Sequence, residues 1–331
     1  MLLRLTKYGI YCPKGDFYID ATGKVSKNIV THAHSDHARP GHSSYLTHRQ
    51  SLPLLKSRLG KKINVQTLDY GKELSINEVK VSLHPAGHIF GSSQVKVSSD
   101  GEIWVVSGDY KLENDHLSVP FEPIKCDTFI TECTFGLPVY SWPDQDLVYD
   151  QINNWWRSNK SQGITSLLFG YSLGKSQRII KNIDHDIGSV FVHKTVGLMN
   201  QAIKSAGGEL PDAIILEEGS NIEDVKGNLI IAPPSITKGR LLHGLGPIST
   251  AMASGWAQTG RNFGRSNVNK GFILSDHADW DGLIKAIEET GAEKIITMHG
   301  YTHELTRFLI EKGLNSMKID DLQHLPYSLN T

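Results

Sequence analysis

Residues 28–40 read NIVTHAHSDHARP and contain four potential metal ligands, His32, His34, Asp36 and His37. The apolar residues ahead of them predict a short strand over residues 28–31, so the four side chains follow where that strand ends. Imidazole and carboxylate groups together suit zinc, manganese or iron(II). A single histidine is most often an ordinary surface residue, but HxHxDH directly after a strand indicates a metal centre. Two ligand pairs this close in sequence favour two adjacent ions over one closed structural site.

Length, charge and cysteine content narrow the class of protein. A chain of 331 residues can form one large or two modest domains. The net charge of -1 means that a nucleic-acid partner would have to be held by a local basic surface. Cys12, Cys126 and Cys133 show no paired spacing, which is typical of a reducing cytoplasm. The N-terminus lacks a signal-peptide core, and no apolar run approaches the roughly 18 residues of a membrane span. We therefore expect a soluble cytoplasmic protein without a membrane partner.

Further candidate ligands end the short strands predicted after residue 78. His88 follows PAG, Asp109 follows VVSG, and Glu132 follows FIT. Taken singly, His88 could be a core histidine, Asp109 a turn residue and Glu132 part of a solvated edge. After a strong metal motif we expect them to belong to the site, because strand ends position ligands on a rigid sheet. Asp20 ends an earlier strand, FYID, and capping the following turn is an equally good reading of it.

Two strand-histidine-helix patterns lie near the C-terminus. Residues 271–291 contain a buried strand, then Asp276 and His277, then an amphipathic helix. Residues 294–313 repeat this order with His299. Both histidines are expected at one edge of the sheet, where strands end and ligands collect.

The central part of the sequence has a different character. Residues 145–161 have a helical pattern, and Trp155 and Trp156 within it are expected in the core rather than on a base-stacking surface. Strands and helices then alternate, which predicts a small parallel-sheet unit inserted into the first fold. We expect an α/β protein with the first fold over residues 1–142 and 259–331 and the insertion over residues 143–258.

Two glycine turns in the insertion are candidate phosphate sites. Ser172, Gly174 and Lys175 form a strand-to-helix turn with backbone amides and a point charge. A well-capped helix without a ligand is an equally good interpretation of this turn. Ser254 and Gly255 form a similar turn. Arg261 and Arg265 follow it and add positive charge.

The order of the motifs HAHSDH, PAGH, SGD, TE, SDHAD and MHG resembles the β-CASP nucleases of the metallo-β-lactamase fold. That group contains RNase J, the Artemis-type DNA nucleases and the pre-mRNA 3′-end cleavage nucleases. The resemblance covers essentially the whole chain. The opening LLRLTKYGIYCPKGDFYID, with THAHSDHARPGH and CDTFITECTFGLPVY, is most similar to the bacterial DNA-ligase-associated exonucleases, a family also linked to mRNA 3′-end processing.

The resemblance implies an αββα sandwich with an inserted β-CASP domain, and a role for each site residue. It implies that one metal ion is held by His32, His34 and His88, a second by Asp36, His37 and His299, and that Asp109 bridges both. It makes Asp20 a brace for the ligand histidines. Glu132 and His277 match the acidic residue and the histidine of the first two β-CASP motifs. The histidine at position 299 favours the branch of RNase J and the 3′-end nucleases, because Artemis-type enzymes usually have valine there. Trp256 and Ala38 also depart from common residues of the family.

The same residues account for phosphodiester hydrolysis. Two divalent ions, Zn²⁺ or Mn²⁺, can activate a hydroxide and neutralise phosphate oxygens, so no protein nucleophile is needed. His277, oriented by Glu132, can donate a proton to the leaving sugar oxygen. The predicted function is a DNA exonuclease that prefers single strands and works in repair with an ATP-dependent DNA ligase and a helicase. The alternative is an RNA-processing nuclease, because the residues that would read the 2′-OH cannot be identified here. A small-molecule hydrolase would not need the insertion or His277.

Overall fold

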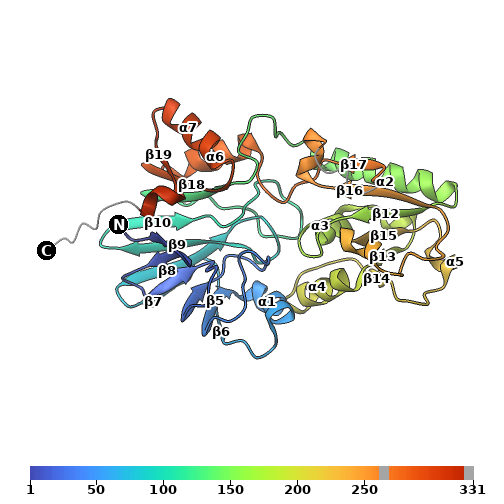
Figure 1. Ribbon diagram of the computed structural model, residues 1–331, viewed down its shortest axis with the longest axis horizontal. Helices are drawn as coiled ribbons and strands as arrows, with labels where there is room; N and C mark the ends of the chain where they lie inside the picture. The colour runs from blue at the N-terminus through green and yellow to red at the C-terminus, as the bar shows by residue number, and fades with distance from the viewer. Residues whose placement is uncertain (261–267, 324–331) are drawn as a thin grey trace. The chain divides into compact units, whose positions relative to one another are not determined.

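The computed structural model describes residues 1–260 and 268–323 and divides the chain into two compact units (Figure 1). Unit 1 contains Met1–Asn114, Ser118–Pro138 and the described residues from His277 onward. Unit 2 contains Asp115–Leu117 and the described residues of Val139–Asp276. Arg261 and Arg265 lie outside the described residues.

The first sheet of unit 1 is the N-terminal sheet, with strand order β1-β2-β3-β4-β5-β6. Neighbouring strands are antiparallel from β1 to β3 and parallel from β3 to β6. The bounds are β1 Arg4–Thr6, β2 Gly9–Cys12, β3 Phe17–Ile19, β4 Lys27–Ile29, β5 Ser44–His48 and β6 Val65–Leu68. Between β5 and β6 lie η1 (Arg49–Ser51) and α1 (Leu52–Leu59), and α1 ends at Gly60.

The second sheet of unit 1 is the central sheet, with strand order β19-β18-β11-β10-β9-β8-β7. Its strands β10, β11, β18 and β19 are parallel neighbours, so their C-terminal ends meet at one edge. The bounds are β7 Glu73–Ile76, β8 Val79–Pro85, β9 Ser93–Ser99, β10 Glu102–Val106, β11 Thr128–Cys133, β18 Lys294–Gly300 and β19 Asn315–Lys318. That edge holds Asp109 after β10, Glu132 within β11 and His299 within β18.

The two sheets of unit 1 pack face to face. Ile10, Ile19 and Ile29 of the N-terminal sheet share one buried cluster with Val81 and Val97 of the central sheet. Alternating apolar residues put one face of each strand into this core.

The other face of the central sheet is covered by α6 (Trp280–Thr290) and α7 (Thr302–Glu311), drawn in red in Figure 1. Leu283 and Leu309 of these helices are buried with Phe129 and Ile295 of the sheet. η6 (Ile319–Gln323) follows β19. The described layers of unit 1 are therefore a helix pair and two stacked sheets.

Unit 2 is built on a parallel sheet with strand order β14-β13-β15-β12-β16-β17. The strands are β12 Thr165–Phe169, β13 Val190–Val192, β14 Ile214–Ile215, β15 Leu229–Ala232, β16 Ile248–Ala253 and β17 Lys270–Phe272. The helices are α2 Gln145–Ser161, α3 Lys175–Asn182, α4 Lys194–Ser205 and α5 Ile222–Val225, with the short η2 His185–Ile187, η3 Pro234–Lys238 and η4 Gly255–Thr259. The helix predicted over residues 145–161 is α2.

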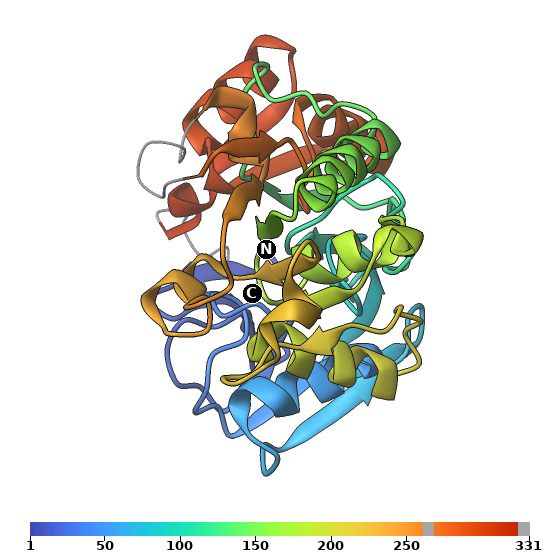
Figure 2. The same cartoon turned by 90° about the vertical axis from the view of Figure 1, so that its right-hand side faces the viewer.

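Helix α2 lies alongside this parallel sheet in both views (Figures 1 and 2). Trp156 is buried with Leu168 and Ile231, so it is a core residue and not a base-stacking surface. Asp144 caps the helix, because its carboxylate accepts a hydrogen bond from the Asp146 amide at 2.8 Å. Unit 2 extends past residue 258 because β17 pairs with β16 and completes the sheet.

None of the helices in the described part of the chain combines the length and apolar character that a bilayer crossing requires.

Candidate metal centre

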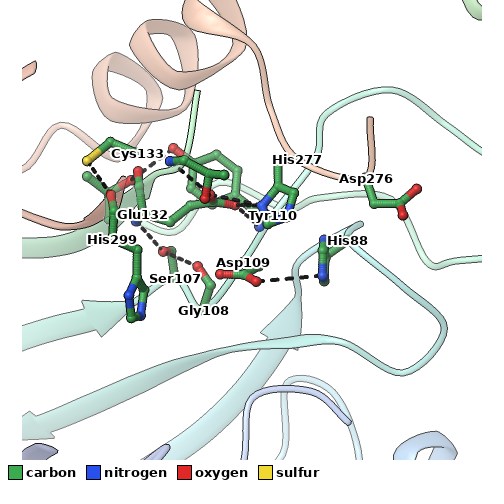
Figure 3. A network of polar contacts seen from close by, with 12 residues as sticks. His88, Ser107, Gly108, Asp109, Tyr110, Glu132, Cys133, Asp276, His277 and His299 are labelled. Atoms are coloured by element: carbon green, nitrogen blue, oxygen red, sulfur yellow. Dashed lines mark hydrogen bonds and ion pairs between the residues drawn. The ribbon is translucent and has the colours of Figure 1, made fainter. Parts of the chain in front are cut away.

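The nitrogen atoms of three histidines meet at the end of the turn after β4. His32 Nε2 lies 3.2 Å from His34 Nδ1, and His88 Nε2 lies 3.1 Å from the same atom. The Oδ2 atom of Asp109 lies 3.5 Å from His32 Nε2 and 3.7 Å from His88 Nε2. Figure 3 shows the contact between Asp109 and His88. Residues from three separate segments therefore form one compact group of ligand atoms.

The spacing of these four atoms fits a divalent metal ion. Ligand atoms placed tetrahedrally at about 2.0–2.1 Å from zinc lie roughly 3.4 Å from one another. Four of the six separations run from 3.1 to 3.7 Å, and all six lie within 4.8 Å. The set of imidazole and carboxylate groups is one that zinc and manganese accept. The residues present therefore fit a metal at this position.

The residues expected at a second metal position are less closely gathered. His37 Nε2 lies 3.4 Å from Asp109 Oδ2 and 3.8 Å from Asp36 Oδ2. The His37 and His299 rings are 5.6 Å apart between centroids. Within residues 1–260 and 268–323, Asp36, His37 and His299 do not form a close group of ligand atoms like the first. His299 lies beside the others but would have to move to share an ion with them.

Burial and neighbouring charges together set the pKa values of His32, His37 and Asp109. Burial, with a smaller contribution from His37, lowers the pKa of His32 well below its ordinary value. Burial would also lower the pKa of His37, but the carboxylates of Asp109 and Asp20 outweigh it and hold this pKa well above its ordinary value. Burial would raise the pKa of Asp109, but His37 outweighs it and holds this pKa well below the ordinary value. The field of the site thus favours a neutral His32 and an ionised Asp109.

Asp20 contacts the ligand segment directly. Its Oδ2 atom lies 2.7 Å from His37 Nδ1, and its Oδ1 atom accepts a hydrogen bond from the Thr31 amide at 2.8 Å. The φ angle of Asp20 is +48°, so it lies in the left-handed region at the end of its strand. Asp20 therefore holds the turn that carries His37 through two side-chain contacts.

His277 and Glu132 form a hydrogen-bonded pair next to the histidine group. The His277 ring points toward the carboxylate of Glu132, with Nδ1 2.9 Å from Oε1 (Figure 3). The Glu132 side chain is 1% exposed and also accepts hydrogen bonds from the Tyr110 amide, at 2.8 Å, and from the Thr134 side chain. Donors on several sides therefore fix this carboxylate, which is a buried residue and not a solvated edge.

A β-bulge places His299. Strand β11 pairs Glu132 with Met298 and Cys133 with Gly300, so His299 is the extra residue and has a φ of +58°. The Cys133 thiol donates to the His299 carbonyl at 2.8 Å, a contact drawn in Figure 3. A Cβ at Gly300 would lie 2.3 Å from the Cys133 carbonyl oxygen, so only glycine fits there.

The predicted phosphate-binding residues belong to unit 2. Ser172 and Ser254 follow β12 and β16, which are parallel neighbours, so both lie at the C-terminal edge of that sheet. The Gly174 amide donates to Gln177 Oε1 at 2.7 Å, and Ser254 caps η4 before the buried Gly255. The Lys175 ammonium group is buried and lies 3.0 Å from Asp276 Oδ2. Lys175 was predicted to offer phosphate a point charge, and in the structure that charge lies in an ion pair with Asp276.

Sequence reasoning missed Thr31, Gly108 and Cys133 as parts of this site. Each directly precedes or follows a predicted site residue, namely His32, Asp109 and Glu132. Their position next to predicted site residues was the one signal in the sequence. The contacts that they make join segments far apart in the sequence and are visible only in the fold.

Comparisons with known proteins find several curated relatives of this chain. A curated protein named probable DNA ligase from Opitutus terrae is 28% identical over 98% of this chain and 32% of its own length. An RNase from Saccharolobus solfataricus, RNase aCSPSF2, is 30% identical over 48% of this chain and 38% of its own length. The endoribonuclease ysh1 of Aspergillus fumigatus is 34% identical over 22% of this chain and 9% of its own length. The names of these relatives indicate a similarity to the β-CASP metallo-β-lactamase nucleases.

The similarity to these relatives covers only part of their length. The chain spans about a third of the length of the first two curated relatives. No model of a known protein family matches it. A solved structure of a protein of unknown function from Enterococcus faecalis shares the fold with a TM-score of 0.60, at 14% identity, over 91% of this chain and 79% of its own. That likeness concerns the fold alone.

Proposed function

We propose that this protein is a metal-dependent phosphodiesterase that acts as a DNA exonuclease and prefers single strands. The observation that carries the proposal is the position of Asp109. Its carboxylate belongs both to the group of His32, His34 and His88 and to the group of Glu132 and His277. A proton donor thus lies within ligand distance of a metal position, as phosphodiester hydrolysis requires.

The site would hold two ions, Zn²⁺ or Mn²⁺. His32, His34, His88 and Asp109 fit the first by their spacing. Asp36, His37 and His299, with Asp109 shared, would hold the second, and a small movement of His299 would complete the set. When bound, such a pair lowers the pKa of a water molecule and neutralises phosphate oxygens.

The protein's own catalytic group in this proposal is His277. A carboxylate only accepts hydrogen bonds, so the proton on Nδ1 is held toward Glu132. The proton given to the leaving sugar oxygen then comes from Nε2 of the imidazolium. Glu132 orients the ring and compensates its charge, in the way a carboxylate orients a catalytic histidine in other hydrolases.

We propose that unit 1 is the αββα metallo-β-lactamase sandwich and unit 2 the inserted β-CASP domain. The face-to-face sheets of unit 1 and the parallel sheet of unit 2 support this reading. Ser172, Gly174, Ser254 and Gly255 would contact backbone phosphate, since they follow neighbouring strands at one sheet edge. Lys175 is left out because its charge is already paired.

DNA is the proposed substrate because the relative matched over 98% of this chain is named a probable DNA ligase. Its name also supports a role in DNA repair beside a ligase. That the ligase is ATP-dependent, that a helicase takes part and that the protein works in the cytoplasm belong to the proposal. The second candidate is RNA processing, which the RNase and endoribonuclease names of other relatives favour.

The test uses end-labelled linear single-stranded DNA, the same DNA as a closed circle, duplex DNA and RNA, each with zinc and with manganese. The proposal predicts rapid release of label from linear single strands and none from the circle. Equal rates on the circle and the linear form would identify an endonuclease. Degradation of RNA alone would replace this proposal by the second candidate.

A further inference from the structure

The hydroxyl group of Thr31 lies at the centre of a buried network. Thr31 Oγ1 lies 2.6 Å from Asp20 Oδ2 and 3.0 Å from His32 Nδ1. The residue is fully buried, so water does not compete for these contacts.

The direction of each hydrogen bond follows from the chemistry of the groups. The Asp20 carboxylate can only accept, so it takes the single hydroxyl proton of Thr31. Having given that proton to Asp20, Thr31 Oγ1 can only accept from His32 Nδ1. His32 therefore carries its proton on Nδ1 and presents the lone pair of Nε2 to His34 and Asp109.

The same carboxylate oxygen orients a second histidine. Asp20 Oδ2 also lies 2.7 Å from His37 Nδ1, and His37 then directs Nε2 toward Asp109 at 3.4 Å. The hydroxyl of Thr31 and the carboxylate of Asp20 thus orient two histidines together. His32 belongs to the first metal position and His37 to the second.

The backbone that delivers Asp109 packs against the same side chain. Gly108 has a φ of +58°, and a Cβ there would lie 2.8 Å from Thr31 Cβ. Only glycine permits this approach. The Thr31 side chain therefore also sets the position of the turn that carries the shared carboxylate.

We propose that Thr31 is a positioning residue that fixes the tautomer of His32 and links the ligands of both metal positions. This inference rests on the proposed metal site. It predicts that loss of the Thr31 hydroxyl weakens both positions together, whereas loss of a ligand such as His299 weakens one.

The experiment compares Thr31→Val, Thr31→Ser and the matched control Thr47→Val. Valine keeps the branched shape of threonine and removes the hydroxyl. Thr47 is also a fully buried threonine of the N-terminal sheet, and its hydroxyl donates to the Val30 carbonyl at 3.0 Å without touching a ligand. Zinc affinity is measured by titration against a competing chelator, and ¹⁵N imidazole spectra of metal-free protein report the tautomer of each histidine.

We expect Thr31→Val to lower zinc affinity about 10–100-fold at both positions, as loss of a contact behind a ligand usually does. Thr31→Ser should stay near wild type, and Thr47→Val should lose stability without losing affinity. Wild-type zinc affinity in Thr31→Val, or an equal loss in Thr47→Val, would overturn the inference. If Thr31→Val does not fold, a wild-type His32 protonated on Nε2 would also overturn it. Zinc binding is read without substrate, so a failure to cleave nucleic acid would contradict only the proposed function.

Discussion

The Nδ1 atom of His277 lies within 3.0 Å of both carboxylate oxygens of Glu132, a residue 145 positions earlier in the chain. The His277 side chain is 23% exposed, whereas the Glu132 side chain is 1% exposed. A buried carboxylate therefore holds an accessible imidazole, which is the arrangement expected of a proton donor.

Replacing His277 should separate chemistry from metal binding. In His277→Asn the amide can still donate to Glu132, but no group remains to deliver a proton. We expect turnover to fall about 10²–10⁴-fold with both metals retained, as measured by single-turnover hydrolysis and metal analysis. His303→Asn, at an exposed position of α7, is the control. Metal-depleted His277→Asn protein would mean that His277 is a ligand and not the acid.

The β-bulge that carries His299 should not tolerate a side chain at Gly300. Gly300→Ala combines a φ of +73° with a Cβ 2.3 Å from a carbonyl oxygen. Gly71→Ala is the control, since Gly71 has a φ of +71° and no atom within 4 Å of an added Cβ. We expect Gly71→Ala to cost about 1 kcal/mol in the free energy of unfolding and Gly300→Ala clearly more, with weaker zinc binding at one position. Equal costs in urea unfolding would argue against a tight bulge.

Replacing Lys175 should lower the stability of unit 2 and leave phosphate binding unchanged. Its side chain is 4% exposed, and its ammonium group pairs with Asp276, which Arg178 also contacts at 3.4 Å. Lys175→Met should lower the free energy of unfolding by up to about 3 kcal/mol. The salt dependence of DNA binding should keep its slope, because no phosphate contact is lost. Lys194→Met, at an exposed lysine of α4, should change stability little. If Lys175→Met flattens the salt dependence of DNA binding and leaves stability unchanged, Lys175 contacts phosphate.

Protonation of His48 should make the protein less stable in mild acid. Its ring stacks on Tyr70 with centroids 3.5 Å apart, and burial lowers its pKa to about 4. An unfolded histidine has a pKa of about 6.5, so the unfolded state binds the extra proton between these values. The stability that neutral His48 contributes is therefore present above about pH 6.5 and is lost as the pH falls toward 4.

His48→Asn tests this pH dependence. The Gln50 amide donates a hydrogen bond to His48 Nδ1, and the side-chain oxygen of asparagine can still accept it. The difference in free energy of unfolding between wild type and His48→Asn should be largest near neutral pH and shrink as the pH is lowered to 4.5. A difference that does not vary over this range would show that His48 titrates normally in the fold.

Local sequence pattern was sufficient for some features and not for others. HAHSDH places four candidate ligands within six residues. The sequence also predicted that Asp109 and Glu132 end short strands, and the structure has them at the ends of β10 and β11. The tautomer network of Thr31 was not predictable, because it depends on Asp20, which reaches it only when β3 pairs with β4.

Long-range pairing also determines the surroundings of Lys175. GKSQ after a strand has the composition of a phosphate turn, and nothing nearby reveals a partner for Lys175. Asp276 supplies that partner from a distant part of the chain, so the charge is buried in an ion pair. The bulge at His299 was hidden for the same reason, because it is defined by the pairing of β18 with β11.

We propose that Asp109 is shared by two ions whose joint presence permits hydrolysis of DNA. The most direct measurement adds zinc or manganese in steps to metal-free protein and follows bound metal and hydrolysis of linear single-stranded DNA in the same samples. We predict little hydrolysis at the first equivalent, a steep rise as the second binds, and a plateau at two ions per chain. A rate that is already maximal at one ion, or the absence of DNA hydrolysis with two ions bound, would contradict the account.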